Sequence, residues 1–228
     1  MADEKLQGFP KAAVPALIKK LEAEAARATQ EARVFAAEAN TTEVSARTAE
    51  RTEKEKLAGN EYHHIYIFDD DVSDSSVERC MKQLTIWDRL APTCDIEVIF
   101  NSPGGSVISG MALFDFLQML RRRGHKVITG SLGYAASMAG ILLQAGDVRW
   151  IGKESYVLIH EISTGAIGKI GEIEDVVEFC KKIQHRVISI FASRSNKSAA
   201  YFEKHWRRKD WWLSSEECEA IGIVDEVR

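Results

Sequence analysis

The chain has 228 residues, of which 45% are hydrophobic and 28% are charged, with a formal net charge of -4 at pH 7. This composition is typical of a globular protein with one core, and it leaves too few residues for two large domains. Acidic and basic side chains are interspersed, which argues against a nucleic-acid partner, because such proteins carry a basic face or stripe.

The termini and the cysteines narrow the class further. The start, Met1–Gly8, carries acids where a secretory signal needs bases, and no apolar run approaches the ~20 residues that span a bilayer, so we expect no membrane segment. The four cysteines lie far apart, without a C-x-x-C pair or a histidine at metal spacing. We therefore expect reduced thiols in a cytoplasm, with no disulfide framework and no zinc or other metal site. The sequence also contains no nucleotide-binding motif, and we expect no cofactor.

The first part of the chain, residues 1–60, differs in composition from the rest. It is rich in Ala, Glu, Lys and Arg, which predicts a long helix over residues 16–57. Its apolar positions follow alternating steps of three and four, the spacing of a coiled-coil seam, at Val14, Ile18, Leu21, Ala25, Ala28, Ala32, Phe35 and Ala39. Because alanine buries little area, a solvated and partly frayed tail is favoured over an arm that packs on another helix of its own oligomer or of a partner.

Residues 61–228 alternate between strand and helix patterns, which predicts an α/β domain. The expected strands are 65–68, 96–100, 127–128, 148–151 and 156–159, and the expected helices are 106–123, from Ser137 to about 145, 172–193 and 198–207. Two capping boxes, Ser75–Glu78 and Ser214–Glu217, predict the start of two further helices. The acidic run Asp69–Asp71 is interpreted as a solvated loop, since no further ligands for a metal are evident.

Two short segments could carry chemistry, and each also has a purely structural explanation. In Asn101–Ser106 two glycines lie between a strand and a helix, where backbone N–H groups can face outward toward negative charge. In Gly133–Gly140 a single hydroxyl, that of Ser137, is surrounded by small residues, so that a carbonyl could approach it. The alternatives are a turn that needs glycine for its geometry and a serine that caps a helix.

His160 ends the apolar run that begins at Tyr156. A lone histidine at a strand end is usually structural, but a hydroxyl becomes a good nucleophile at neutral pH only when a nearby base takes its proton. His160 is therefore a candidate catalytic base only if the fold places it beside a hydroxyl such as that of Ser137.

Four runs together resemble the Clp-type serine peptidases over residues 62–228. They are Asn101–Ala112, Gly133–Gly140, Val157–His160, and Lys209–Glu217 with Gly222–Glu226. The resemblance implies that Ser137 is the nucleophile, His160 the general base and Asp210 the carboxylate that orients the histidine. It also implies an oxyanion hole made by the backbone N–H groups of Gly105 and Met138.

The resemblance further implies a fold and an assembly. The fold is the ClpP/crotonase-like ββα-repeat domain, here with a long N-terminal helical arm. The family assembles as a homo-oligomeric ring, and rings stack through a handle that residues 163–174 and the following helix resemble. Protein substrates would bind in extended form along this segment.

The chain also departs from the family pattern. In the family a short N-terminal segment docks an ATP-dependent unfoldase, and here an arm of nearly sixty residues takes its place, which puts that partner in doubt. In addition, Glu161-Ile162 after the histidine and Trp211-Trp212 after the aspartate differ from the residue pairs that the family usually has there. These features look most like the maturation proteases of tailed bacteriophages, which cut capsid and scaffold proteins in the host cytoplasm or the assembling virion. The alternatives are a bacterial Clp proteolytic subunit, an inert scaffold protein and a crotonase-like acyl-CoA enzyme.

Overall fold

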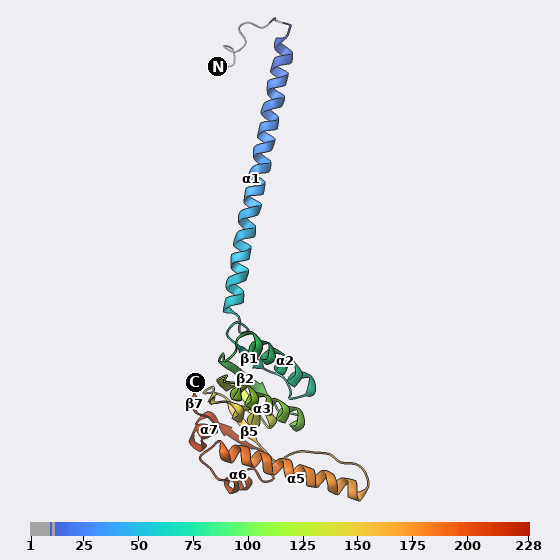
Figure 1. The fold of residues 1–228 in the computed structure, drawn as a ribbon, viewed down its shortest axis with the longest axis vertical. Helices are drawn as coiled ribbons and strands as arrows, with labels where there is room; N and C mark the ends of the chain where they lie inside the picture. Colours follow the sequence, from blue (N-terminus) through green and yellow to red (C-terminus); the bar gives the residue numbers. More distant parts are fainter. Residues whose placement is uncertain (1–9, 11) are drawn as a thin grey trace. The chain divides into compact units, whose positions relative to one another are not determined.

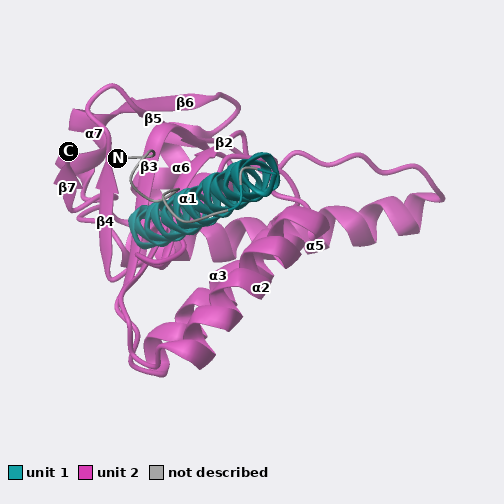
Figure 2. Ribbon diagram, turned by 90° about the horizontal axis from the view of Figure 1, so that it is seen from above, with its two compact units in different colours: residues 1–59 teal, residues 60–228 magenta. Residues whose placement is uncertain are grey.

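The computed structural model describes residue 10 and residues 12–228. The chain divides into two compact units, residues 1–59 and residues 60–228 (Figure 2). The boundary expected after residue 60 lies next to this division. The part of the expected arm in residues 1–9 and at residue 11 lies outside the described residues.

Among the described residues of the first unit there is one helix, α1 (Val14–Ala58) (Figure 1). It begins with a proline in its first turn, where the missing N–H costs nothing, and ion pairs at i, i+4 spacing such as Glu43–Arg47 follow its surface. No residue of α1 is buried, and Phe35 is 74% exposed. The long helix predicted from composition is confirmed, and between these bounds it is unbroken, in contrast to the partly frayed tail that the sequence favoured.

The second unit is an α/β domain built on one sheet (Figure 1). Its strands are β1 (Ile65–Phe68), β2 (Ile96–Ser102), β3 (Val127–Ala136), β4 (Val148–Ile151), β5 (Tyr156–Ile159), β6 (Trp211–Ser214) and β7 (Glu226–Val227). Its helices are α2 (Asp74–Leu90), α3 (Val107–Arg122), α4 (Met138–Leu142), a 3₁₀ turn (Leu143–Ala145), α5 (Ile170–Ser193), α6 (Ala199–Trp206) and α7 (Ser215–Ile221).

The sheet has the strand order β1-β2-β3-β4-β7, and β5 and β6 branch from it beside β3. All pairs are parallel except β5 with β6. Strand β3 is long enough to pair twice: its residues 128–131 pair with β4, and its residues 134–136 pair with β5. The second half of β3 and the strands beside it therefore form a branch that carries the chain beyond the main sheet.

The core lies between the sheet and the helices that cover it. Its largest fully buried side chains include Phe68, Phe100, Leu84, Leu113, Leu117, Phe191, Phe202 and Trp206. The C-terminal half of α5 joins this core, where Phe191 stacks on Phe202 of α6 at a ring separation of 5.5 Å. The N-terminal half of α5 has no buried residue, and with the segment before it extends away from the rest of the unit (Figure 1).

Three details differ from the sequence-based predictions. Helix α2 is capped by Ser73, and Ser76 takes the place of the glutamate in the capping box, so the box predicted at Ser75–Glu78 was wrong. The strand predicted at residues 127–128 continues to Ala136, and strands β6 and β7 were not predicted. The capping box of Ser214 and Glu217 is confirmed.

The buried face of α3 provides a test of the core. Replacing Leu113, which is fully buried, with alanine should lower the free energy of unfolding by about 2–4 kcal/mol, because the cavity cannot collapse completely. The same change at Leu90, which is 79% exposed, should stay within about 0.5 kcal/mol. Denaturant unfolding followed by tryptophan fluorescence measures both, since all five tryptophans belong to the second unit. Equal effects of the two changes would contradict the described packing.

Candidate active site

Ser137 lies between the last residue of β3 and the first residue of α4. Its backbone has φ 54° and ψ -120°, a conformation that is strained for a residue other than glycine. Its hydroxyl makes no capping hydrogen bond to α4, in contrast to the common role of a serine at this position. Instead the Oγ atom lies 2.7 Å from Nε2 of His160, which is hydrogen-bonding distance.

The parallel pairing of β3 with β5 explains why these two side chains meet. Ala136 pairs with Leu158, and the N–H of Ser137 donates a hydrogen bond of 2.9 Å to the carbonyl of Leu158. Ser137 and His160 both follow the carboxyl ends of their strands, β3 and β5. Ligand sites of α/β sheets commonly lie at this edge. His160 is the first residue after β5, with its side chain 26% exposed, so it reaches the hydroxyl while remaining open to a substrate.

Asp210 is placed by strand β6. The antiparallel register pairs Ile159 with Trp211, so one step beyond this pair His160 and Asp210 face each other. The Oδ1 atom of Asp210 lies 3.9 Å from Nδ1 of His160, within ion-pair range but longer than a hydrogen bond. The carboxylate is 68% exposed. The structure thus gathers all three side chains, with a close Ser–His contact and a longer His–Asp contact.

Two backbone amides flank the hydroxyl. Val72 bridges to Gly105 by accepting from the N–H of Ser106 at 2.7 Å and donating to the carbonyl of Gly104 at 2.8 Å. This pattern uses the groups on either side of Gly105 and leaves its own N–H directed away from Val72. Met138 is the first residue of α4, so its N–H has no partner inside the helix. Both amides are therefore available to an oxygen of a ligand.

The turn at Gly104 and Gly105 requires glycine, because the backbone around Ser137 and at Val72 leaves no room for side chains there. A Cβ atom on Gly104 would lie 2.7 Å from Cβ of Ser137, and one on Gly105 would lie 2.4 Å from the carbonyl oxygen of Val72. Both residues also have positive φ values. The glycines thus permit the contact that places the turn against the serine.

A cavity of about 220 Å³ joins these groups. Gly105, Ser137, Met138 and His160 line it, whereas Asp210 does not. The rest of its wall is mainly apolar and comprises Val107, Ile141, Ile159, Ile162, Val187, Phe191 and Trp206, with Glu161 and Ser163 at its polar part. The cavity can therefore hold an apolar side chain beside the hydroxyl.

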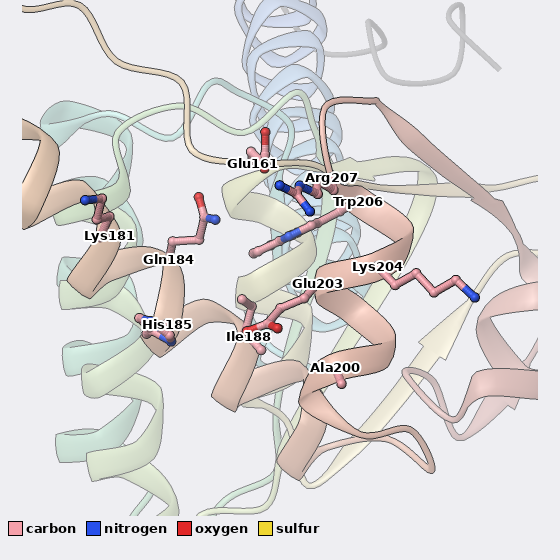
Figure 3. Close-up of a pocket in the computed structure, with 10 residues that line it drawn as sticks. All are labelled: Glu161, Lys181, Gln184, His185, Ile188, Ala200, Glu203, Lys204, Trp206 and Arg207. Carbon is pink, nitrogen blue, oxygen red and sulfur yellow. The ribbon is translucent and has the colours of Figure 1, made fainter.

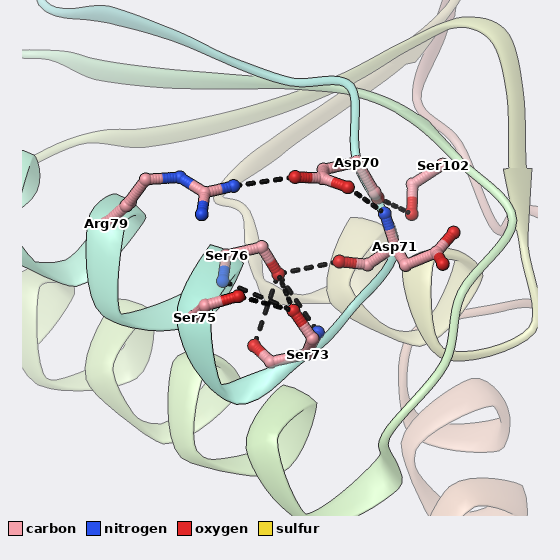
Figure 4. A network of polar contacts seen from close by, with 7 residues as sticks. All are labelled: Asp70, Asp71, Ser73, Ser75, Ser76, Arg79 and Ser102. Carbon is pink, nitrogen blue, oxygen red and sulfur yellow. Dashed lines mark hydrogen bonds and ion pairs between the residues drawn. The ribbon is translucent and has the colours of Figure 1, made fainter.

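The loop before α2 supports the Gly105 turn, a role that the sequence did not reveal (Figure 4). The Asp70 carboxylate forms an ion pair with Arg79 at 2.6 Å, and the Ser102 hydroxyl donates to the Asp70 carbonyl at 2.6 Å. These contacts hold the loop, and with it Val72, against Gly105. The acidic run Asp69–Asp71 thus belongs to the loop that supports the Gly105 turn. Among the described residues, no group of three or more His, Cys, Asp and Glu side chains could hold a metal ion.

A second and larger cavity of about 500 Å³ lies between α5 and α6 (Figure 3). It shares Glu161 and Trp206 with the first cavity. Lysine, arginine, histidine and glutamate side chains surround its floor of Ile188 and Trp206. None of the three gathered side chains lines it, whereas Ser137 and His160 line the smaller cavity.

Two of the four cysteines, Cys80 and Cys218, are poor candidates for a nucleophile. All four thiols are free, and Cys80 and Cys218 are buried. Burial raises the pKa of Cys80 far above its ordinary value and raises the pKa of Cys218 to about 12. Since the thiolate is the reactive form, neither thiol is a nucleophile at neutral pH.

No helix among the described residues is both long enough and apolar enough to cross a bilayer.

Comparison with known proteins identifies the family. A family model described as Clp protease matches residues 50–228. The ATP-dependent Clp protease proteolytic subunits of Bacteroides fragilis and Bacteroides thetaiotaomicron are each 34% identical to the chain over 160 residues. Each match covers 68% of this chain, and 74% and 70% of the respective relatives. The chain therefore belongs to the Clp protease family and is a serine peptidase.

The strain at Ser137 can be measured. Replacing Ser137 with glycine should give a protein about 1 kcal/mol more stable than replacing it with alanine, because glycine adopts positive φ without steric cost. Both changes remove the hydroxyl and its bond to His160, so their difference reports the strain at positive φ, reduced by the ~0.4–1 kcal/mol of chain entropy that glycine loses on folding relative to alanine. Denaturant midpoints of the two variants give the value, and an alanine variant more stable than the glycine variant would show that residue 137 is not strained.

Proposed function

We propose that this member of the Clp protease family is a serine endopeptidase that hydrolyses peptide bonds of protein substrates through an acyl-enzyme. Ser137 is the nucleophile, His160 the general base and Asp210 the carboxylate that orients the imidazole. One observation carries the proposal: the 2.7 Å contact between Oγ of Ser137 and Nε2 of His160, in a cavity that Gly105 and Met138 also line.

In the first half of the reaction His160 Nε2 takes the proton of Ser137 as Oγ attacks the scissile carbonyl. The carbonyl oxygen becomes an oxyanion, which accepts hydrogen bonds from the N–H groups of Gly105 and Met138. The imidazolium then gives its proton to the leaving amine, the C–N bond breaks, and the acyl group remains on Oγ. Asp210 favours the imidazolium in this step through its negative charge on the Nδ1 side.

In the second half a water molecule replaces the amine. His160 takes a proton from the water as its oxygen attacks the acyl carbon, and the same two amides receive the second oxyanion. Collapse of this intermediate returns the proton from His160 to Oγ and releases the new carboxyl terminus. The apolar cavity wall favours a substrate with an apolar side chain next to the scissile bond.

The names of the relatives support a proteolytic subunit that works with an ATP-dependent partner, which we propose to be an unfoldase in a cytoplasm. The reported relatives are named as ATP-dependent proteolytic subunits of bacteria, and this chain has no nucleotide-binding motif of its own, so the partner would use the ATP. The exposed segment before α5 and the exposed half of that helix support assembly into a homo-oligomeric ring, and rings would stack through them. A ring of this kind would enclose the site and restrict it to unfolded chains.

Helix α1 keeps the head maturation protease of a bacteriophage as a second candidate. None of its 45 residues is buried, so its surface would suit binding to a capsid or scaffold protein. The crotonase-like fold and acyl-CoA chemistry, which also uses two amides to hold an oxyanion, would leave the Ser137–His160 contact without a role. An inert scaffold would not need that contact either.

A fluorophosphonate probe tests the nucleophile, because it reacts with an activated serine. We expect the intact protein to carry one adduct at Ser137, found by mass spectrometry, and the Ser137→Ala variant to carry none. The same variant should lower kcat for a fluorogenic peptide at least ~10⁴-fold. An adduct at another serine, or equal hydrolysis by both proteins, would refute the assignment of Ser137.

Removing residues 1–57 tests the arm. Hydrolysis of a short fluorogenic peptide should stay within about twofold, because the contacts that build the site all lie in residues 60–228. Degradation of a large protein target should fall, since α1 would supply recognition. Equal loss of both activities would show that the arm is needed to form the site itself.

A further inference from the structure

Asp210 is the least constrained of the three gathered side chains. Within the part of the chain that the structure describes, its carboxylate has no hydrogen-bond partner, and only the longer contact with His160 involves it. Its position must therefore come from the backbone on either side. Downstream, β6 pairs with β5 and fixes Trp211 opposite Ile159. Upstream, the chain leaves α6 at Trp206 through a short loop that lies outside both elements.

This loop, residues 207–209, is a tight turn with an unfavourable residue in it. Arg208 has φ 57°, the left-handed conformation that residues other than glycine and asparagine rarely adopt. One backbone bond within the turn, from the N–H of Lys209 to the carbonyl of Trp206 at 3.2 Å, closes it. A turn with this strain needs an additional contact to keep one conformation.

Glu161 provides that contact. Its Oε2 atom accepts a hydrogen bond of 3.2 Å from the N–H of Arg208. Glu161 directly follows His160, so consecutive residues after β5 contact the segment between α6 and β6: the histidine faces Asp210, and the glutamate contacts Arg208 in the loop before it. Figure 3 shows Glu161 beside Arg207 at the end of α6, on the wall of the larger cavity.

We propose that Glu161 is a positioning residue that holds the 207–209 loop and thereby sets the distance between Asp210 and His160. The expected effect of Glu161 on the rate rests on the proposed function, whereas its contact with Arg208 does not. Glu161 acts through the loop and does not exchange protons with the substrate. Its side chain needs an oxygen acceptor at the end of a two-carbon chain, and that acceptor does not need a charge.

The chemistry of the acceptor defines the decisive pair of variants. Glu161→Gln keeps a carbonyl oxygen at the same reach, so the loop should stay in place and kcat for a short peptide should remain within about threefold of the wild type. Glu161→Ala removes the acceptor, so kcat should fall about ten- to hundredfold while KM changes little, because misplacement of an orienting group affects the transition state more than substrate binding. Glu203→Ala is the matched control, since Glu203 is another carboxylate of the same cavity but belongs to α6.

A double-mutant cycle separates positioning from other roles. In a chain that already carries Asp210→Ala, the change Glu161→Ala should lower kcat by less than about twofold, because the group that it positions is gone. A full additional loss in that background would mean that Glu161 acts by another route and would overturn the proposal. So would a glutamine variant as slow as the alanine variant, which would indicate that the charge is what matters, or a rise in KM alone, which would indicate a binding role.

Hydrogen exchange gives a readout that does not depend on catalysis. Peptides spanning residues 207–210 should exchange faster in Glu161→Ala than in the wild type and in Glu161→Gln, whereas Glu203→Ala should match the wild type. Unchanged exchange in the alanine variant would overturn the proposal even in an active enzyme. A different outcome separates the two proposals. If the wild type is not labelled by the fluorophosphonate but Glu161→Ala still exchanges faster than the wild type, the proposed function is refuted and the positioning role of Glu161 remains supported.

Discussion

The double pairing of β3 is the constraint on which the candidate site depends. Its first half pairs with β4 and its second half pairs with β5, which in turn pairs with β6. Each of the three gathered side chains lies one residue outside this branch: Ser137 after β3, His160 after β5 and Asp210 before β6. Backbone hydrogen bonds of the sheet therefore set the positions of all three, and strands give more precise placement than free loops do.

The strained backbone at Ser137 follows from the same arrangement. The chain must turn from β3 directly into α4, whose residues Met138–Leu142 are all buried, so neither end of the turn can move to relieve the strain. The cost is of the order of 1–3 kcal/mol. In return the hydroxyl points away from the helix that it would otherwise cap and toward His160. The glycines of the 104–105 turn allow a second backbone segment to approach this point closely.

The sequence predicted the class of fold because apolar runs and glycine-bounded turns are local signals. It also indicated Ser137 and His160 as candidates, although only a family resemblance joined them to Asp210. The physical link to Asp210 is β6, a four-residue strand that stands directly before a strong helix cap, so no periodic pattern marks it. The support of Gly105 by Val72 is a contact between segments far apart in the sequence, and the local pattern of neither segment contains it.

The gathered side chains differ in how firmly the fold holds them. The contact between Ser137 and His160 is at hydrogen-bond distance and belongs to a cavity with an apolar wall, whereas Asp210 is mostly exposed. Water weakens the attraction between a carboxylate and an imidazolium, and the same pair gains strength when water is excluded. Excluding water from Asp210 would therefore strengthen its attraction to His160 more than it would change the Ser–His contact. The carboxylate side of the site is thus where binding of a substrate can still improve the geometry.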